Sequence, residues 1–251
     1  YSMKIVVLKF GGTSVGSISR IKKVAEIITK YSKKFKVIVL SSAMSGTTNK
    51  LINFSKKISN NFADHEYDML VSAGEQISCS LLSGQLIENG IKSRSWMEWQ
   101  IPIITEGKHK YSRITNINKK KIIKFLQAGG VPVIAGFQGI NKDSRITTIG
   151  RGGTDASAIM FANFFKAHKC IIYTDVQGVY TTDPNKLKSA KKIKKISYEE
   201  MLEMSSLGSK VMQPHSIQDA RLNRIDIEVK SSFVNKSGTL ITKRKNIINN
   251  K

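Results

Sequence analysis

Cysteine, acidic residues and long apolar runs are all scarce in this sequence, and each shortage excludes a class of protein. Only two cysteines, Cys79 and Cys170, occur in 251 residues. They are far apart and lie inside apolar runs, so we expect buried, reduced thiols of a cytoplasmic protein rather than a disulfide scaffold. No stretch approaches the roughly 18 consecutive apolar residues of a membrane-spanning helix, so we expect no membrane partner.

The shortage of acidic residues leaves a large positive charge. The formal charge is +23, from 41 Lys and Arg against 18 Asp and Glu, a balance that favours nucleic acid or an anionic membrane as partner. However, only eight of these basic residues are Arg, whereas Lys and Ile each occur 33 times and Asn 15 times. Lys, Ile and Asn have A/T-rich codons, while contacts to phosphates and bases favour Arg. We therefore attribute the charge to compositional drift and expect no specific nucleic-acid partner.

Several common catalytic motifs are also missing. The four His and two Cys have no metal-ligand spacing, so we expect no metal site built from side chains. The sequence has no G-x-S-x-G nucleophile elbow, no G-x-x-x-x-G-K-[ST] phosphate loop, and neither H-R-D nor D-F-G. These absences argue against zinc enzymes, α/β-hydrolases, P-loop proteins and protein kinases.

Short β-branched segments alternate with helical segments along the chain. Residues 4–9 and 36–40 are nearly continuous apolar runs, typical of strands buried on both faces, and residues 17–31 between them have helical spacing. The same alternation continues with helices at 64–89 (interrupted near residue 74), 118–127, 155–166, 198–205 and 214–223, and with strands at 131–135, 169–174 and 226–230. It predicts an α/β fold, a mostly parallel sheet covered on both faces, with ligands at the carboxyl ends of the strands.

Glycine-rich loops follow these predicted strands. In residues 9–14, Lys9 ends a strand and two glycines let the backbone approach an anion just before a helix. The loop at 147–155 combines Arg151 with Asp155, which together could hold the carboxylate and ammonium of an amino acid. Alternatively, Thr154 or Asp155 only caps the following helix.

Two further segments carry polar side chains, and for each segment both a binding role and a purely structural role are open. Glu75 lies at the predicted interruption of a helix, where it is either a ligand or a solvated charge at a helix start. Thr174, Asp175 and Tyr180 follow a strand and could offer a hydroxyl, a carboxylate and a ring to a nucleotide. Tyr180 could equally cover the core.

Seven segments, in order, resemble the catalytic domain of aspartokinases. They are KFGGTSV (9–15), SAM (42–44) with TT (47–48), SAGE (72–75), AGFQG (135–139), TIGRGGTD (148–155), TDVQGVY (174–180) and LGSK (207–210), closed by GTLI (238–241). Together they are highly specific. The resemblance identifies residues 3–242 as an amino-acid kinase catalytic domain, with residues 243–251 as a C-terminal tail.

The resemblance implies the fold and the reaction. The fold would be an αβα sandwich around a mainly parallel sheet of about eight strands. The reaction would transfer phosphate from MgATP to the β-carboxylate of L-aspartate, the first step of lysine, threonine, methionine and diaminopimelate synthesis, carried out by a homodimer. Because a carboxylate is already a nucleophile, catalysis would consist of alignment and charge neutralisation. Mg²⁺ would be held by ATP phosphates and water rather than by the protein.

The resemblance also assigns residues to the site. Lys9 and Lys210 would contact the phosphates, Asp155 would orient these lysines, Arg151 would hold the α-carboxylate of aspartate, and Glu75 would face its ammonium together with Asp155. The implied ATP-binding residues are Lys9, Phe10, Gly11, Gly12, Thr174, Asp175, Tyr180 and Lys210. The implied aspartate-binding residues are Ser42, Thr48, Glu75, Phe137, Gln138, Gly139, Arg151, Gly152, Gly153, Thr154 and Asp155.

Some features depart from the family pattern. Gln177 and Asn185 stand where family members usually have Asp and Arg, so we expect a lower affinity for ATP. Aspartokinases usually continue into two ACT domains, whereas only residues 242–251 follow the last matching segment, so we expect no ACT domain and no feedback inhibition in this chain.

Two alternatives remain open. Acetylglutamate kinase, glutamate 5-kinase and uridylate kinase share the fold, although the segments at 72–75 and 151–154 favour an amino-acid substrate. A catalytically weak regulatory or nucleic-acid-binding protein is the alternative from a different class.

Overall fold

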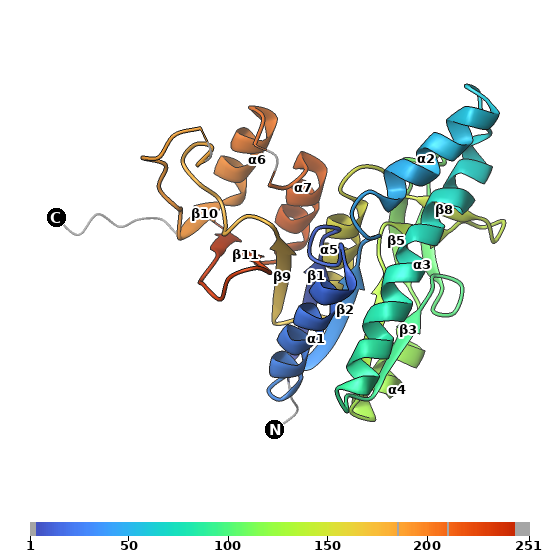
Figure 1. Cartoon of the computed structure of the whole chain (residues 1–251), viewed down its shortest axis with the longest axis horizontal. Helices are drawn as coiled ribbons and strands as arrows, with labels where there is room; N and C mark the ends of the chain where they lie inside the picture. Colours follow the sequence, from blue (N-terminus) through green and yellow to red (C-terminus); the bar gives the residue numbers. More distant parts are fainter. Residues whose placement is uncertain (1–3, 185, 210, 244–251) are drawn as a thin grey trace.

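A mostly parallel sheet of eight strands runs through the computed structural model, which describes residues 4–184, 186–209 and 211–243 (Figure 1). Its strands, in spatial order, are β10 (Lys195–Ser197), β12 (Thr239–Thr242), β11 (Ile227–Ser231), β9 (Lys169–Thr174), β1 (Ile5–Phe10), β2 (Lys36–Ser41), β6 (Val131–Ala135) and β3 (Ser93–Trp96). Among the pairings within it, only β11 with β12 is antiparallel. The predicted α/β fold and strand number are therefore confirmed.

Helices cover both faces of this sheet. The helices are α1 (Ile18–Ser32), α2 (Thr47–Ile58), α3 (Asp64–Glu88), α4 (Lys120–Gln127), α5 (Gly153–Phe164), α6 (Tyr198–Ser206) and α7 (Pro214–Asn223). Successive side chains of a strand point to opposite faces, so β1 sends Val6 and Leu8 into one core with α1 and α3, and Val7 into another with α4 to α7. The continuous apolar runs predicted for buried parallel strands follow from this two-sided cover.

A smaller sheet was not predicted. Its strands, in spatial order, are β5 (Arg113–Ile117), β4 (Ile103–Glu106), β7 (Gln138–Ile140) and β8 (Ile146–Thr148). The loop at residues 107–112 connects β4 to β5, and the loop at 149–152 connects β8 to α5. Among the described residues, no helix combines the length and the apolar character that a membrane crossing requires.

The interruption predicted near Gly74 is wrong, because α3 continues through this position without a break. A Cβ atom at Gly74 would lie 2.8 Å from the Cβ of Ala43, in the segment that follows β2. The glycine therefore allows close packing of the helix on that segment instead of ending a helix. As a result, Glu75 lies in the interior of α3 with 3% of its surface exposed, so it is not a solvated charge at a helix start.

Candidate active site

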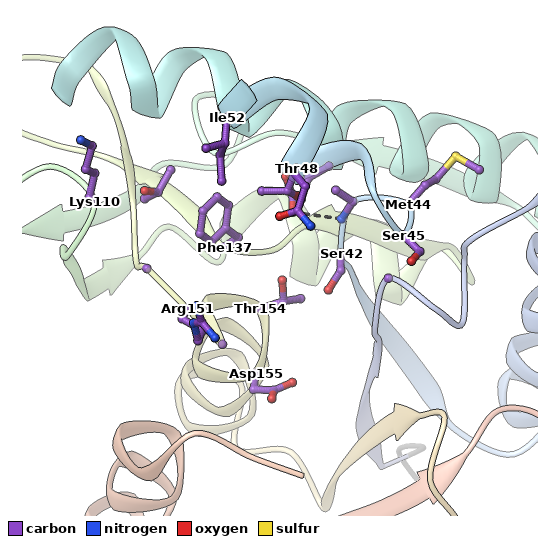
Figure 2. A pocket seen from close by; sticks show the side chains of 18 of the residues that line it. Ser42, Met44, Ser45, Thr48, Ile52, Lys110, Phe137, Arg151, Thr154 and Asp155 are labelled. Carbon is purple, nitrogen blue, oxygen red and sulfur yellow. Dashed lines mark hydrogen bonds between the residues drawn. The ribbon is translucent and has the colours of Figure 1, made fainter. Parts of the chain in front are cut away.

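A cavity of about 850 Å³ opens at the carboxyl ends of β1 and β2, where ligands gather in parallel α/β sheets (Figure 2). Its walls come from the segments after these two strands, from α3, and from the loop that leads into α5. The predicted site residues that line it are Lys9, Gly12, Ser42, Thr48, Glu75, Phe137, Arg151, Gly152, Gly153, Thr154 and Asp155. Eleven predicted residues from five separate segments thus share one cavity.

Lys9 and Asp155 form an ion pair in this cavity. The Nζ atom of Lys9 lies 2.8 Å from Oδ1 of Asp155, and each side chain is 10% exposed. Helix α5 begins after Gly152, whose φ of 74° is left-handed, so the N-cap is Gly152 and neither Thr154 nor Asp155 caps the helix. Asp155 lies instead in the first turn of α5, where the positive end of the helix favours a carboxylate. The pair places one cation and one anion on a shared wall.

The loop before α5 exposes Arg151 to the same cavity. Gly150 and Gly152 both have positive φ, and a Cβ at Gly152 would lie 2.5 Å from Cγ of Gln213. Glycine is therefore needed for the loop to pack closely against the segment before α7. Within the described part of the chain, Arg151 makes no ion pair or hydrogen bond. Its guanidinium is available to a carboxylate, which it can bind through two parallel hydrogen bonds.

Glu75 presents a buried carboxyl group to the cavity from α3. Its Oε1 accepts a hydrogen bond of 2.9 Å from the Ala43 amide, while Oε2 has no hydrogen-bond partner among the described residues. The pKa of Glu75 is raised to about 8, chiefly because the group is buried; the Ala43 amide lowers it and the charge of the nearby Glu98 adds to the rise. A ligand cation would stabilise the ionised form of this group.

Phe137 occupies a strained backbone position beside the cavity. Its φ is 73°, which is uncommon for a residue other than glycine. Its amide donates to Oγ of Ser157 at 3.0 Å and its carbonyl accepts from the Ile149 amide at 2.9 Å, so both polar groups of the backbone are fixed. Backbone strain that its surroundings hold in place is common at ligand sites.

The structure does not bring Gln138 and Gly139 to the cavity wall. Gln138 is buried in β7 and donates to Oε2 of Glu98 at 3.0 Å. A Cβ at Gly139 would overlap Thr105 of the neighbouring strand β4. Both residues serve the packing of the small sheet, and only Phe137 of this trio reaches the cavity.

A second cavity, of about 840 Å³, opens beyond the carboxyl end of β9. Thr174, Asp175 and Tyr180 all line it, which places three predicted ATP-binding residues together. Tyr180 is half-buried in the wall and pairs through its backbone with Lys192, so it is a wall residue rather than a cover for the core. Lys210, predicted to contact phosphates, lies outside the described residues.

Two residues of the glycine-rich loop differ from expectation. Phe10 is fully buried and its ring stacks on that of Tyr173 with centroids 4.8 Å apart, so its side chain lines neither cavity. The amide of Gly11 donates to the Tyr173 carbonyl at 3.1 Å and is not free for a phosphate. Gly12 lines the first cavity and its amide makes no such bond, so Gly12 is the better phosphate donor of the two.

Sequence patterns missed part of the cavity wall. These residues are Ala43, Met44, Ser45, Gly46, Asn49, Ile52, Tyr67, Lys110, Tyr111, Thr148 and Gly150. Most of them lie on α2, its approach or the loop at 107–112. Ala43, Met44, Thr148 and Gly150 lie within the matching segments at 42–44 and 148–155 but were not assigned to the site. No local signal marks the others, because the packing of α2 and that loop against α3 brings them to the cavity.

The described side chains offer no built metal site. In residues 4–184, 186–209 and 211–243, no group of three His, Cys, Asp or Glu side chains lies close enough to hold a metal ion.

Comparison with known proteins identifies the family to which this chain belongs. The chain matches the model of the Amino acid kinase family over residues 4–231. It is 48% identical over 240 residues to the aspartokinase of Geobacillus stearothermophilus, covering 95% of this chain and 59% of that protein. It is 46% identical over 241 residues to the aspartate kinase of Pseudomonas putida, covering 96% of this chain and 59% of that protein. The chain thus spans about 59% of the length of these relatives.

Solved structures agree with the sequence comparison. The aspartate kinase from Synechocystis superimposes with a TM-score of 0.84 at 40% identity, covering 95% of this chain and 40% of that chain. E. coli aspartokinase III, crystallised with aspartate and ADP, gives a TM-score of 0.87 at 26% identity, covering 97% of this chain and 66% of that chain. The UMP kinase from Bacillus anthracis, with a TM-score of 0.71 at 18% identity, shares the fold. The chain belongs to the amino acid kinase family.

Proposed function

We propose that the chain transfers a phosphoryl group from ATP to the β-carboxylate of L-aspartate and forms 4-phospho-L-aspartate. The observation that carries this proposal is the charge set of the first cavity. Aspartate has two carboxylates and one ammonium, and the cavity holds the cations Lys9 and Arg151 together with the buried carboxyl of Glu75. Arg151 binds the α-carboxylate, Glu75 faces the ammonium, and Lys9 lies where the β-carboxylate meets the transferred phosphate.

The relatives support this assignment. The curated relatives reported above are aspartokinases, and the related E. coli enzyme was crystallised with aspartate and ADP. The order of the matching segments and the shared cavity agree with a carboxylate acceptor rather than a nucleotide acceptor.

The mechanism follows from the chemistry of the groups. A carboxylate oxygen of aspartate attacks the γ-phosphorus without a general base, because it is already ionised at neutral pH. The bond between the γ-phosphorus and the β,γ-bridging oxygen breaks, and ADP leaves with that oxygen. Lys9 neutralises charge on the transferred phosphoryl group, and the Gly12 amide adds a hydrogen bond to its oxygens. Asp155 holds the Lys9 ammonium at the carboxyl end of β1, so the cation is positioned before the substrates bind.

ATP occupies the second cavity in this proposal. Thr174, Asp175 and Tyr180 contact the nucleotide, and Lys210 contacts its phosphates. Mg²⁺ arrives with ATP, held by phosphate oxygens and water, as is common for this ion. β1 and β9 are adjacent strands, so their carboxyl ends set the two cavities side by side.

Steady-state turnover with aspartate and MgATP tests the proposal. Trapping of the acyl phosphate by hydroxylamine should give product with aspartate and little with acetylglutamate or glutamate, and a separate assay should show no UDP formation from UMP. Lys9→Met serves as the inactive control. Turnover of acetylglutamate, glutamate or UMP in preference to aspartate would contradict the proposal and would assign the chain the activity of another member of the family.

A homodimer and a cytoplasmic location are part of the same proposal. Light scattering of the purified chain checks the first, since a monomer at micromolar concentration would contradict it.

The positive charge of the chain is proposed to have no role in specific nucleic-acid binding. Binding to DNA that disappears near physiological salt would agree with a charge produced by compositional drift.

A further inference from the structure

Asp68 is a fully buried carboxylate on α3 that the proposed reaction does not use. Its side chain is 0% exposed, and it lies seven residues before Glu75 on the same helix. It accepts hydrogen bonds from Nδ1 of His109 at 2.6 Å, from Oγ1 of Thr148 at 2.6 Å, and from the Lys110 amide at 3.1 and 3.2 Å. A buried charge is tolerated only when it is bonded in this way, so all three donors are needed.

These bonds join three walls of the first cavity. The helix α3 contributes Tyr67 to the lining, the loop at 107–112 contributes Lys110 and Tyr111, and β8 contributes Thr148. Figure 2 shows Lys110 at the edge of the cavity, with Phe137 and Arg151 between it and Asp155. Asp68 therefore lies behind the part of the cavity wall that Lys110 and Thr148 form.

The loop at 107–112 is strained and needs such support. Lys110 has a φ of 69°, in the left-handed region that a lysine rarely adopts. The backbone amide of this same residue donates the hydrogen bonds to Asp68. The Ser112 amide donates to the Thr148 carbonyl at 3.0 Å, so the loop is also tied to β8. Strained positions persist where the surrounding contacts fix them.

The loop in turn adjoins the segment that carries Arg151. A Cβ at Gly150 would lie 2.8 Å from the Lys110 carbonyl oxygen and 3.5 Å from the Tyr111 ring. The two backbones are in close contact one residue before Arg151. A shift of the loop at 107–112 would therefore change where the Arg151 guanidinium lies.

We propose that Asp68 is a positioning residue that fixes the loop at 107–112 as the end wall of the cavity and thereby holds Arg151 in place for the α-carboxylate of the amino acid. This inference rests on the proposed function for the identity of the ligand. It assigns Asp68 to substrate binding and not to phosphoryl transfer, because its bonds reach neither Lys9, Asp155 nor the second cavity.

Asp68→Asn tests the proposal, with Asp64→Asn as the matched control. Asp64 pairs with the Lys110 ammonium on the outer side of the same loop, where the Asp64 side chain is 60% exposed. For Asp68→Asn we expect the KM for aspartate to rise about tenfold or more, the size expected for loss of charged hydrogen bonds, with kcat and the KM for ATP within about threefold. For Asp64→Asn we expect all three constants within about twofold.

Amide hydrogen exchange gives a second readout that does not depend on activity. Exchange across residues 108–112 should be about tenfold faster or more in Asp68→Asn, and unchanged in β1. If Asp68→Asn does not fold, His109→Ala, which removes one donor from the partly exposed face, should show the same changes to a smaller extent.

Three results would overturn the inference: an unchanged KM for aspartate in a folded Asp68→Asn protein, an equal rise of the KM for ATP, or unchanged exchange of the loop. If the wild-type chain does not phosphorylate aspartate, the proposed function fails, while the exchange experiment still decides whether Asp68 holds the loop.

Discussion

The Lys9 ammonium lies 2.8 Å from the Asp155 carboxylate, in a pair that joins the end of β1 to the first turn of α5. Each side chain is 10% exposed, so water screens the pair less than it screens an exposed pair. The strand fixes the cation and the helix fixes the anion. Under the proposed function, the positive charge that phosphoryl transfer needs is therefore held in place by the main sheet and by a helix that covers it.

Lys9→Met should lower kcat by about 10²-fold or more, because it removes a preorganised charge from the transferred phosphoryl group. Asp155→Asn should also lower kcat, and the double variant should lose little more than Lys9→Met, since the two residues act as a unit. A coupled assay for ADP release measures all three. Near wild-type turnover in Lys9→Met would contradict the assignment.

Arg151→Lys should raise the KM for aspartate by about tenfold, with kcat changed by less than about threefold. Lysine keeps the charge but cannot form the two parallel hydrogen bonds by which a guanidinium grips a carboxylate. Arg113→Lys is the control, because Arg113 lines a neighbouring cavity but not this one. Equal effects of the two substitutions would show that Arg151 has no special role.

Glu75 should make both stability and aspartate binding depend on pH. Burial raises its pKa to about 8 in the folded chain, compared with about 4.3 in an unfolded chain, so the folded state holds its proton more strongly. The free energy of unfolding should therefore fall as the pH rises from about 5 to 8, and Glu75→Gln should remove this slope. Denaturant titrations at several pH values measure it.

The same group should release a proton when aspartate binds below pH 8, because the ammonium favours the ionised carboxylate. Isothermal titration in two buffers of different ionisation enthalpy measures the release, and Glu75→Gln should abolish it. Proton uptake, or no exchange of protons in the wild type, would argue against Glu75 as the ammonium partner.

Two glycines of α3 should respond in opposite directions to alanine. At Gly84 a Cβ would meet nothing within 4 Å, so Gly84→Ala should stabilise the chain by about 1 kcal/mol through helix propensity. At Gly74 the new Cβ would press on Ala43, and Gly74→Ala should cost about 1–3 kcal/mol in spite of that gain. Thermal unfolding measures both. A stabilised Gly74→Ala protein would show that α3 shifts away from Ala43 at little cost.

Much of the main sheet could be predicted because its strands are buried on both faces. The runs at 4–9, 36–40 and 169–174 each fall within one residue of the observed strand ends. The short strands β7, β8 and β10 have three residues each, too few to form a recognisable strand pattern, and β10 pairs with β12, far along the chain. Helix α2 was not predicted; it buries only Ser55, and its place in the fold depends on contacts with α3 that no local pattern records.

Part of the candidate site could likewise be predicted from the sequence, and part of it could not. Lys9, Arg151 and Asp155 belong to glycine-rich motifs, so their place near the carboxyl ends of the strands, where they share one cavity, could be predicted. Gly74 was predicted to break the helix because sequence alone does not distinguish a glycine that ends a helix from one that allows close packing. Asp68 escaped notice because its three donors come from distant positions in the chain.

The residues that line the two cavities come from two different parts of the chain. The described residues that line the first lie between positions 9 and 155, and those that line the second lie between positions 174 and 211. Apart from Lys9 and Gly12, which the proposal places at the transferred phosphate, the residues proposed to bind the amino acid and those proposed to bind the nucleotide therefore come from separate stretches of the chain. Under the proposed function, the preference for one ligand can drift over generations while the geometry that selects the other is inherited unchanged.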